Sequence, residues 1–128
     1  MTDPHMTDIF ALCNVIRETS FAIHCYLRNG HRERIYENAL VHRLRKQGIG
    51  IEQQPEVRVF DEDGTELGYL RADLLVEGQL ICEIKAVRMI INEHTAQLLG
   101  YLRASRLEHG LLINFGGPRL EVRKLILS

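Results

Sequence analysis

Residues 80–87 read LICEIKAV, an apolar run that carries one acid and one base two positions apart. Its length and its apolar content predict a largely buried β-strand. Because side chains alternate between the two faces of a strand, Glu83 and Lys85 should share one face with Ile81 and Val87. We therefore expect an acid and a base to lie side by side among apolar neighbours.

The run RADLLV just before this strand is predicted to pair with it as a β-hairpin. A three-residue loop with its glycine in the left-handed conformation would pair Leu75 with Gln79. In that register Asp73 and Glu83 are diagonal neighbours on one face, with backbones about 7 to 8 Å apart. The hairpin thus predicts that two carboxylates and a lysine converge.

Two explanations of this cluster stay open. Partly buried charges cost several kcal/mol unless they are paired, and a hard divalent cation such as Mg²⁺ would pair the two carboxylates while keeping positions for water and phosphate. Lys85 would then orient or help to deprotonate a metal-bound water. Alternatively, Glu83 and Lys85 form an ion pair on the wet face of an edge strand, and Asp73 is an ordinary acid near a turn.

Around this hairpin, hydrophobic spacing and turn residues predict the element order ααβββαββ. The expected helices cover residues 8–28, 32–47 and 92–106, the last with Asn92 as its N-cap, and the expected strands cover 51–60, 67–75, 80–87, 111–115 and 120–127. Such an order is typical of an α/β (α+β) domain with a mixed sheet of about five strands flanked by helices. We expect a single domain over residues 8–128, with residues 1–7 disordered or derived from cloning.

The composition is that of an ordinary soluble protein, because 45% of the 128 residues are hydrophobic and 26% are charged. No apolar run reaches the roughly 20 residues that span a bilayer, and the polar start lacks the regions of a signal peptide, so we expect no membrane association and a cytoplasmic location. The three cysteines form no CxxC pair and are expected to be small buried side chains. The net charge of −1 conceals a basic segment, residues 28–46, and an acidic segment, residues 52–66.

Asp73, followed by Glu83-Ile84-Lys85 at the end of a hairpin, resembles the signature of the PD-(D/E)XK nuclease superfamily, whose fold is restriction-endonuclease-like. Residues 30–36, GHRERIY, resemble the motif that names the GxxExxY protein family within that superfamily. The likeness continues through YLRADLLV, ICEIKAV, HTAQLLGYL and GLLINFGGPRLEVRK, and so covers about residues 20–124. One departure is Ala72, which stands where the superfamily has a proline before its first acid.

The resemblance implies a catalytic role for the residues of this signature. Asp73 and Glu83 would bind Mg²⁺ or Mn²⁺ together with the backbone carbonyl of Ile84, and Lys85 would serve the attacking water. Glu33, from the second helix, would be the carboxylate that completes or supports the metal site.

The spacing within the second helix leaves the identity of this helix carboxylate open. Glu33, Tyr36, Glu37 and Leu40 follow each other at i, i+3, i+4 and i+7 and therefore share one face. Glu37 is thus a rival of Glu33, and Tyr36 is a candidate substrate-binding residue beside them. The alternative is a solvent-facing acid near a helix N-terminus, which the helix dipole favours.

The third helix offers further candidates for contact with substrate. His94, Gln97 and Tyr101 are spaced to line one helical stripe, and Gln97 with Tyr101 resembles the QxxxY element of RecB-like nucleases, which lies near the scissile phosphate. Otherwise His94 and Gln97 are exposed and Tyr101 belongs to the core. Arg71 shares a strand face with Asp73 and could contact phosphate, neutralise the acids or form a plain salt bridge.

These expectations combine into metal-dependent hydrolysis of a nucleic-acid phosphodiester, with DNA favoured over RNA and Mg²⁺ or Mn²⁺ as cofactor. A nuclease-like binding module that is inactive alone and holds nucleic acid or a protein partner is the main alternative. A metal-free structural subunit would need Arg71 and Lys85 alone to neutralise the acids. Because single-domain nucleases often pair to cut both strands of a duplex, we also expect a homodimer.

Overall fold

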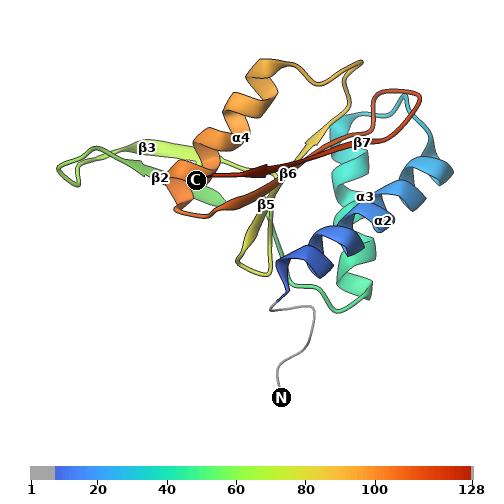
Figure 1. Cartoon of the computed structure of the whole chain (residues 1–128), viewed down its shortest axis with the longest axis horizontal. Coiled ribbons are helices and arrows are strands. Elements are labelled where there is room, and N and C mark those ends of the chain that lie inside the picture. The colour runs from blue at the N-terminus through green and yellow to red at the C-terminus, as the bar shows by residue number, and fades with distance from the viewer. Residues whose placement is uncertain (1–7, 128) are drawn as a thin grey trace.

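The computed structural model describes residues 8–127, and Figure 1 shows the arrangement of their helices and strands. The helices are α2 (Ile9–Leu27), α3 (Glu33–Lys46) and α4 (Asn92–Ser105). The strands are β1 (Ile51–Gln53), β2 (Glu56–Phe60), β3 (Glu66–Arg71), β4 (Leu74–Val76), β5 (Leu80–Lys85), β6 (His109–Asn114) and β7 (Glu121–Ile126). The prediction for residues 1–7 lies outside the described residues. None of the helices within residues 8–127 is long and apolar enough to cross a membrane.

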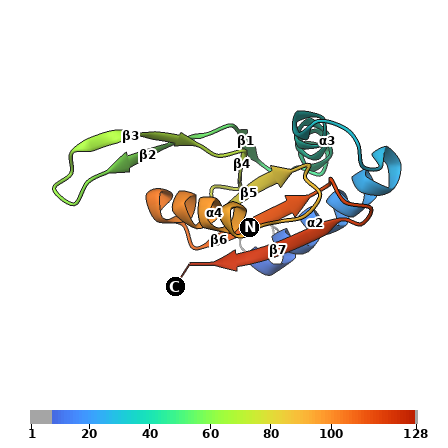
Figure 2. The same cartoon turned by 90° about the horizontal axis from the view of Figure 1, so that it is seen from above.

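The strands form a mixed five-stranded sheet and a separate two-stranded one. The larger sheet has the order β1-β4-β5-β6-β7, and β5 and β6 are its parallel pair. Strands β2 and β3 form the smaller sheet, an antiparallel hairpin that Figure 2 shows projecting away from the helices α2 and α3. The predicted α+β class, with a mixed sheet of five strands flanked by helices, is confirmed.

The predicted element order was wrong at two places, because two expected strands are each broken. The strand expected over residues 51–60 stops at Gln53 and restarts at Glu56, since Gln54 has a φ of 56° and Pro55 has no N–H to give to a ladder. The strand expected over 67–75 is likewise interrupted, between β3 and β4. The observed order is therefore ααβββββαββ.

The register of the β4–β5 hairpin also differs from the prediction. Leu75 pairs with Ile81, not with Gln79. The loop has three residues, as expected, but it lies one position later, at residues 77–79, and both Glu77 (φ 52°) and Gly78 (φ 66°) adopt the left-handed conformation. The shift amounts to two residues, so every side chain keeps its predicted face.

Strand β5 separates two hydrophobic clusters. Cys82 and Ile84 contribute to the cluster that α2 and α3 cover, whereas Ile81 packs with Leu98 of α4 and Leu112 of β6 on the other face. This division confirms the alternation predicted for LICEIKAV. Glu83 therefore points to the face that α4 covers.

Two smaller expectations were wrong. The N-cap of α4 is Ile91 rather than Asn92, because the side chain of His94 accepts a hydrogen bond from the Ile91 backbone N–H at 3.0 Å and closes the first turn. Cys13 and Cys82 are buried as expected, but Cys25 is exposed, because it is not on the face of α2 that packs into the core.

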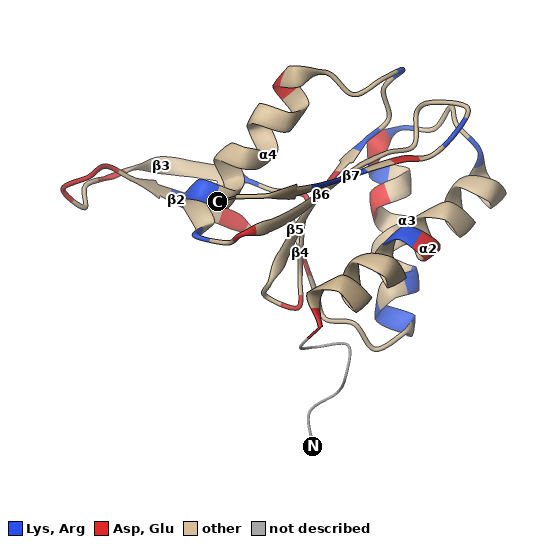
Figure 3. Ribbon diagram, in the orientation of Figure 1, with Lys and Arg blue, Asp and Glu red and all other residues tan. Residues whose placement is uncertain are grey.

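Charge is unevenly distributed over the fold, as Figure 3 shows. The acidic segment predicted from the sequence includes the tip of the β2–β3 hairpin, where Asp61, Glu62 and Asp63 join the two strands. Basic residues lie on the loops at the other end of the molecule, near the N-terminus of α3. The acidic tip and the basic loops thus lie at opposite ends of the domain.

Candidate active site

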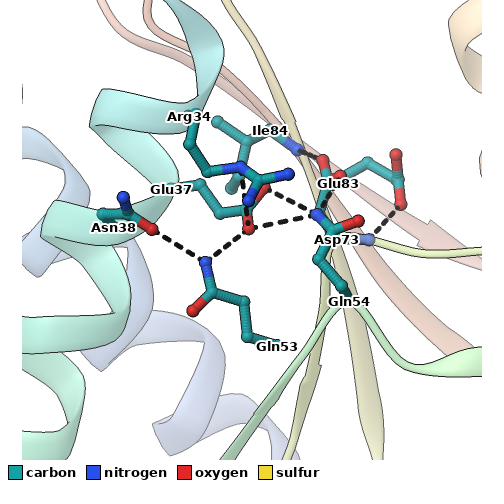
Figure 4. Close-up of polar contacts among 8 residues, drawn as sticks. All are labelled: Arg34, Glu37, Asn38, Gln53, Gln54, Asp73, Glu83 and Ile84. Atoms are coloured by element: carbon teal, nitrogen blue, oxygen red, sulfur yellow. Dashed lines mark hydrogen bonds and ion pairs between the residues drawn. The ribbon is translucent and has the colours of Figure 1, made fainter.

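The backbone of the β4–β5 hairpin places Asp73 and Glu83 opposite each other. Asp73 comes directly before β4, one position beyond the Leu74–Cys82 pair. Its backbone N–H donates to Glu83 Oε1 at 2.9 Å, and its own Oδ2 accepts from the Ile84 N–H at 2.7 Å. Each carboxylate thus accepts a backbone hydrogen bond from the facing strand, as Figure 4 shows. These two bonds fix both side chains where the regular ladder ends.

Burial and mutual repulsion perturb both acids. Glu83 is only 3% exposed, and burial followed by the charge of Asp73 raises its pKa to about 8. Burial also raises the pKa of Asp73, and Glu37 and Glu33 raise it further, whereas the Ile84 N–H and the Lys85 ammonium lower it. Within the described part of the chain, the positive charge near Asp73 and Glu83 is therefore too small to offset their burial and mutual repulsion.

The structure places both rival helix carboxylates near this pair but in different surroundings. Glu37 is 3% exposed and accepts hydrogen bonds from Gln54 Nε2 at 3.0 and 3.1 Å and from Gln53 Nε2 at 2.6 Å. Gln54 Nε2 also reaches Asp73 Oδ1 at 3.4 Å, so its amide bridges the two acids (Figure 4). Glu33 is exposed at the first position of α3 and raises the pKa of Asp73 and of Glu83. The oxygens of Glu37 are thus occupied, whereas those of Glu33 face solvent.

Sequence reasoning missed the two glutamines. Gln53 ends β1, and Gln54 turns the chain so that its backbone N–H donates to the Asp73 carbonyl at 2.7 Å. The available signal was Pro55, which cannot continue a central strand and so marks a break at which polar side chains can turn inward. The glutamines supply the donors that a buried Glu37 requires.

Lys85 and two residues of the α4 stripe lie beside the acids. Lys85 Nζ donates to Gln97 Oε1 at 3.1 Å. Tyr101 is 6% exposed, and burial, then Glu83 and Asp73, raise the pKa of its hydroxyl to about 12. Tyr101 therefore stays protonated and keeps a hydroxyl next to the carboxylates. The ring of His94 instead caps the N-terminus of α4, where its Nδ1 accepts a hydrogen bond from the Ile91 N–H.

The two remaining candidates lie outside these contacts. Tyr36 is fully buried, stacks on Phe115 with ring centroids 4.6 Å apart and donates its hydroxyl hydrogen bond to the Arg28 carbonyl. Arg71 is exposed, donates to the Gln54 carbonyl at 3.0 Å and lies 3.8 Å from a Glu56 oxygen. The structure therefore brings together Asp73, Glu83, Lys85, Gln97 and Tyr101, with both helix carboxylates near them.

The donor set suits a hard divalent cation, although within residues 8–127 no three His, Cys, Asp or Glu side chains are gathered closely enough to form a complete cage. Mg²⁺ is commonly held by one or two carboxylates and keeps its other ligands as water and phosphate oxygens, so two acids are enough. Asp73 Oδ2 and Glu83 Oε1 are held by backbone N–H groups. The remaining oxygens are Glu83 Oε2 and Asp73 Oδ1, and the latter has only the long 3.4 Å contact with Gln54 Nε2. A positive ion there would offset the repulsion that raises the pKa of Glu83.

The mixed sheet, its flanking helices and the β4–β5 hairpin with Asp73 and Glu83 define an α+β domain of the restriction-endonuclease-like class. The family model of the PD-(D/E)XK nuclease superfamily matches residues 11–125, and the chain belongs to that superfamily. No curated protein matches the sequence significantly. The fold is similar to that in a crystal structure of a protein designated SSO0001, with a TM-score of 0.60 and 22% sequence identity over 73% of this chain. The match covers 50% of that protein, so this chain corresponds to about half of its length.

Proposed function

We propose that the domain hydrolyses phosphodiester bonds of nucleic acid in a metal-dependent reaction, with DNA as the expected substrate. The single observation that carries the proposal is the facing pair of Asp73 and Glu83, held by reciprocal backbone hydrogen bonds next to Lys85. Membership of the nuclease superfamily supports the same reaction class. The cytoplasmic location, the homodimer and the assignment to the GxxExxY group stay predictions.

The carboxylates of Asp73 and Glu83 would hold the Mg²⁺ or Mn²⁺ ion, with the Ile84 carbonyl as a further ligand. When bound, the ion would polarise the phosphoryl oxygen and lower the pKa of a bound water. Glu33, exposed at the start of α3, would be an additional acid on the solvent side of the site, where it would contact the metal ion or its water ligands.

The remaining residues would position the water and the substrate. Lys85 would orient the attacking water, and its hydrogen bond to Gln97 Oε1 holds the ammonium group in place until substrate arrives. Tyr101 stays protonated across the physiological range and so offers a hydroxyl to a phosphate oxygen. Arg71 would contact phosphate only after exchanging its present contact with Glu56.

The test is cleavage of labelled single- and double-stranded DNA and RNA with Mg²⁺ or Mn²⁺, run on the parent and on Glu83→Gln and Lys85→Ala proteins. Glu52→Gln and Lys46→Ala are matched controls, because both side chains are exposed and lie outside the contacts of the site. We expect the controls to cut like the parent. Each site variant should lose about 100-fold or more, because Glu83→Gln removes a proposed metal ligand and Lys85→Ala removes the group proposed to orient the attacking water.

Two results would count against the proposal. Equal cleavage by the parent and both site variants would show that another site, or a contaminant, cuts the substrate. Metal binding by the parent without cleavage of any of the four substrates would instead favour the nuclease-like binding module, which holds nucleic acid or a protein partner.

A further inference from the structure

Three loops meet at the end of the domain that carries the candidate site, and hydrogen bonds connect them. They are residues 28–32, 86–91 and 116–120, named here the basic rim. Asn29 Nδ2 donates to the Gly116 carbonyl at 3.4 Å, and His24 Nε2 lies 3.0 Å from the Gly117 carbonyl. Asn114 Oδ1 accepts from the N–H groups of Val87 and Gly116, both at 3.0 Å. The rim is therefore one connected surface.

The basic rim carries concentrated positive charge without internal neutralisation. Its three loops contain Arg28, Arg32, Arg88 and Arg119 and not a single acid. All four arginines are exposed, and none of them pairs with a carboxylate anywhere in residues 8–127. The arginines of the β2–β3 hairpin differ, since Arg58 lies 3.3 Å from a Glu66 oxygen. The four arginines of the basic rim are thus available to bind a negatively charged ligand.

The rim is continuous with the candidate site. The first loop ends immediately before Glu33, and the second begins immediately after Lys85. The third is joined to β5 through the Phe115 N–H, which donates to the Lys85 carbonyl at 2.8 Å. A chain of phosphates lying on the rim would therefore lead to the carboxylates.

On its far side the rim opens into a groove of about 750 Å³ between α2 and β7. Arg17, Arg28 and Arg119 line this groove, and Glu18 is its one acid among the described lining residues. Phe21 also lines it and is 61% exposed. A positively charged groove with an exposed aromatic ring is the combination that binds single-stranded nucleic acid, because phosphates contact the cations and unpaired bases stack on the ring.

We propose that the basic rim and this groove bind a single strand of nucleic acid through its phosphates, with Phe21 as a stacking platform, and direct it to Asp73 and Glu83. The proposal rests on the proposed function for what happens at the carboxylates, but the binding surface itself does not depend on cleavage. The acidic tip of the β2–β3 hairpin repels phosphate, so the strand is held on the rim side of the site.

Binding is tested by fluorescence anisotropy in EDTA with labelled single strands and duplexes of both DNA and RNA. We compare the parent with Arg28→Gln/Arg119→Gln and with Phe21→Ala. The matched controls are Lys46→Gln/Arg103→Gln, which removes the same charge elsewhere, and Phe60→Ala, which removes an aromatic ring that is 55% exposed on the hairpin. Thermal unfolding of each variant verifies that the fold is retained.

We expect single strands to bind more tightly than duplexes. Because each phosphate contact on a single strand contributes about 0.7 to the slope of log K against log salt, the arginine double variant should lose about 1.4 of slope. Loss of one stacking platform should weaken binding about tenfold in Phe21→Ala. Both controls should match the parent. The DNA and RNA arms then identify which backbone is preferred.

Cys25 provides a direct readout of groove occupancy, since it is exposed, lines the groove and is the one accessible thiol among Cys13, Cys25 and Cys82. A bound single strand should slow alkylation of Cys25 in the parent but not in the arginine double variant. Equal protection by polyglutamate at the same ionic strength would overturn the proposal, because the surface would then recognise any polyanion.

Other outcomes separate this proposal from the nuclease function. Rim variants that bind like the parent while the parent cleaves would refute the binding surface and leave the nuclease standing. Rim-dependent binding by a parent that cuts nothing would support the surface and remove the nuclease. Duplex binding as tight as single-strand binding, unaffected by Phe21→Ala, would overturn the single-strand assignment.

Discussion

Glu83→Gln tests the electrostatic state of the candidate site without any substrate. Burial and Asp73 raise the pKa of Glu83 from 4.5 to about 8. Between these two pH values the folded protein keeps a proton on this carboxyl, whereas the unfolded chain has lost it. Stability must therefore fall as the pH rises from 4.5 to about 8. Glutamine keeps the length of the side chain and an oxygen for the Asp73 N–H, but it removes the charge.

The magnitude follows from the two pKa values. Because a tenfold change in an ionisation constant corresponds to about 1.4 kcal/mol, a rise from 4.5 to about 8 costs the folded state up to about 5 kcal/mol when Glu83 is ionised. Local relaxation and water entry reduce that cost, so we expect Glu83→Gln to stabilise the metal-free domain by about 2 to 5 kcal/mol near pH 8.5. Near pH 4.5 the two proteins should differ by less than about 1 kcal/mol.

Urea unfolding of both proteins in EDTA, from pH 4.5 to 8.5, measures this difference in the free energy of unfolding. Glu52→Gln is the matched control, since the exposed Glu52 side chain should give a flat difference over the same range. A stability difference between the parent and Glu83→Gln that stays constant with pH would refute the reasoning. In that case Glu83 ionises normally and its burial is offset by contacts other than those described above.

Three further substitutions test how the site is supported. Tyr36→Phe should lower the free energy of unfolding by about 1 to 2 kcal/mol in urea, because the stacked ring stays while two backbone hydrogen bonds to the hydroxyl are lost; an unchanged midpoint would contradict this role. Gln54→Ala should cost about 1 to 3 kcal/mol in guanidinium, because Glu37 stays buried with fewer donors, and no loss would mean that water replaces the amide. Gly116→Ala should cost about 3 kcal/mol or more in calorimetry, because its Cβ would lie 2.2 Å from the Val87 carbonyl oxygen; wild-type melting would show that the loop can move.

The β4–β5 hairpin could be predicted from the sequence because side chains alternate between the two faces of a strand with a period of two. A register error of two residues left Asp73 and Glu83 on the same face, and it changed them only from diagonal to opposite neighbours. Helix boundaries were also close to prediction, since the turn Asn29-Gly30 and Gly48 mark the ends of α2 and α3 clearly. Local signals of this kind do not depend on the rest of the fold.

The breaks in two strands could not be predicted in the same way. Ile51, Val57 and Val59 share one face of an extended run, so the pattern indicates one strand over residues 51–60 even though Pro55 signals a break. In the structure Gln54 has a left-handed φ, and its N–H donates to the Asp73 carbonyl. That bond continues the non-local pairing of β1 with β4, in which Gln53 pairs with Leu74. The β2–β3 hairpin consequently leaves the main sheet, which local sequence alone does not indicate.

The burial of Glu37 follows from the spacing of residues in α3, but the partners of its carboxylate do not. Tyr36 and Leu40 are both fully buried, so the face that they share with Glu37 points into the core. A carboxylate on such a face needs donors, because an unpaired buried charge is far more costly than a surface one. Gln53 and Gln54 are polar residues at a strand break, which makes them the natural source of those donors. The same requirement separates the two helix acids. Glu37 is committed to the amides of Gln53 and Gln54, whereas Glu33, one turn earlier, is exposed. For that reason we propose Glu33, rather than Glu37, as the additional acid of the site.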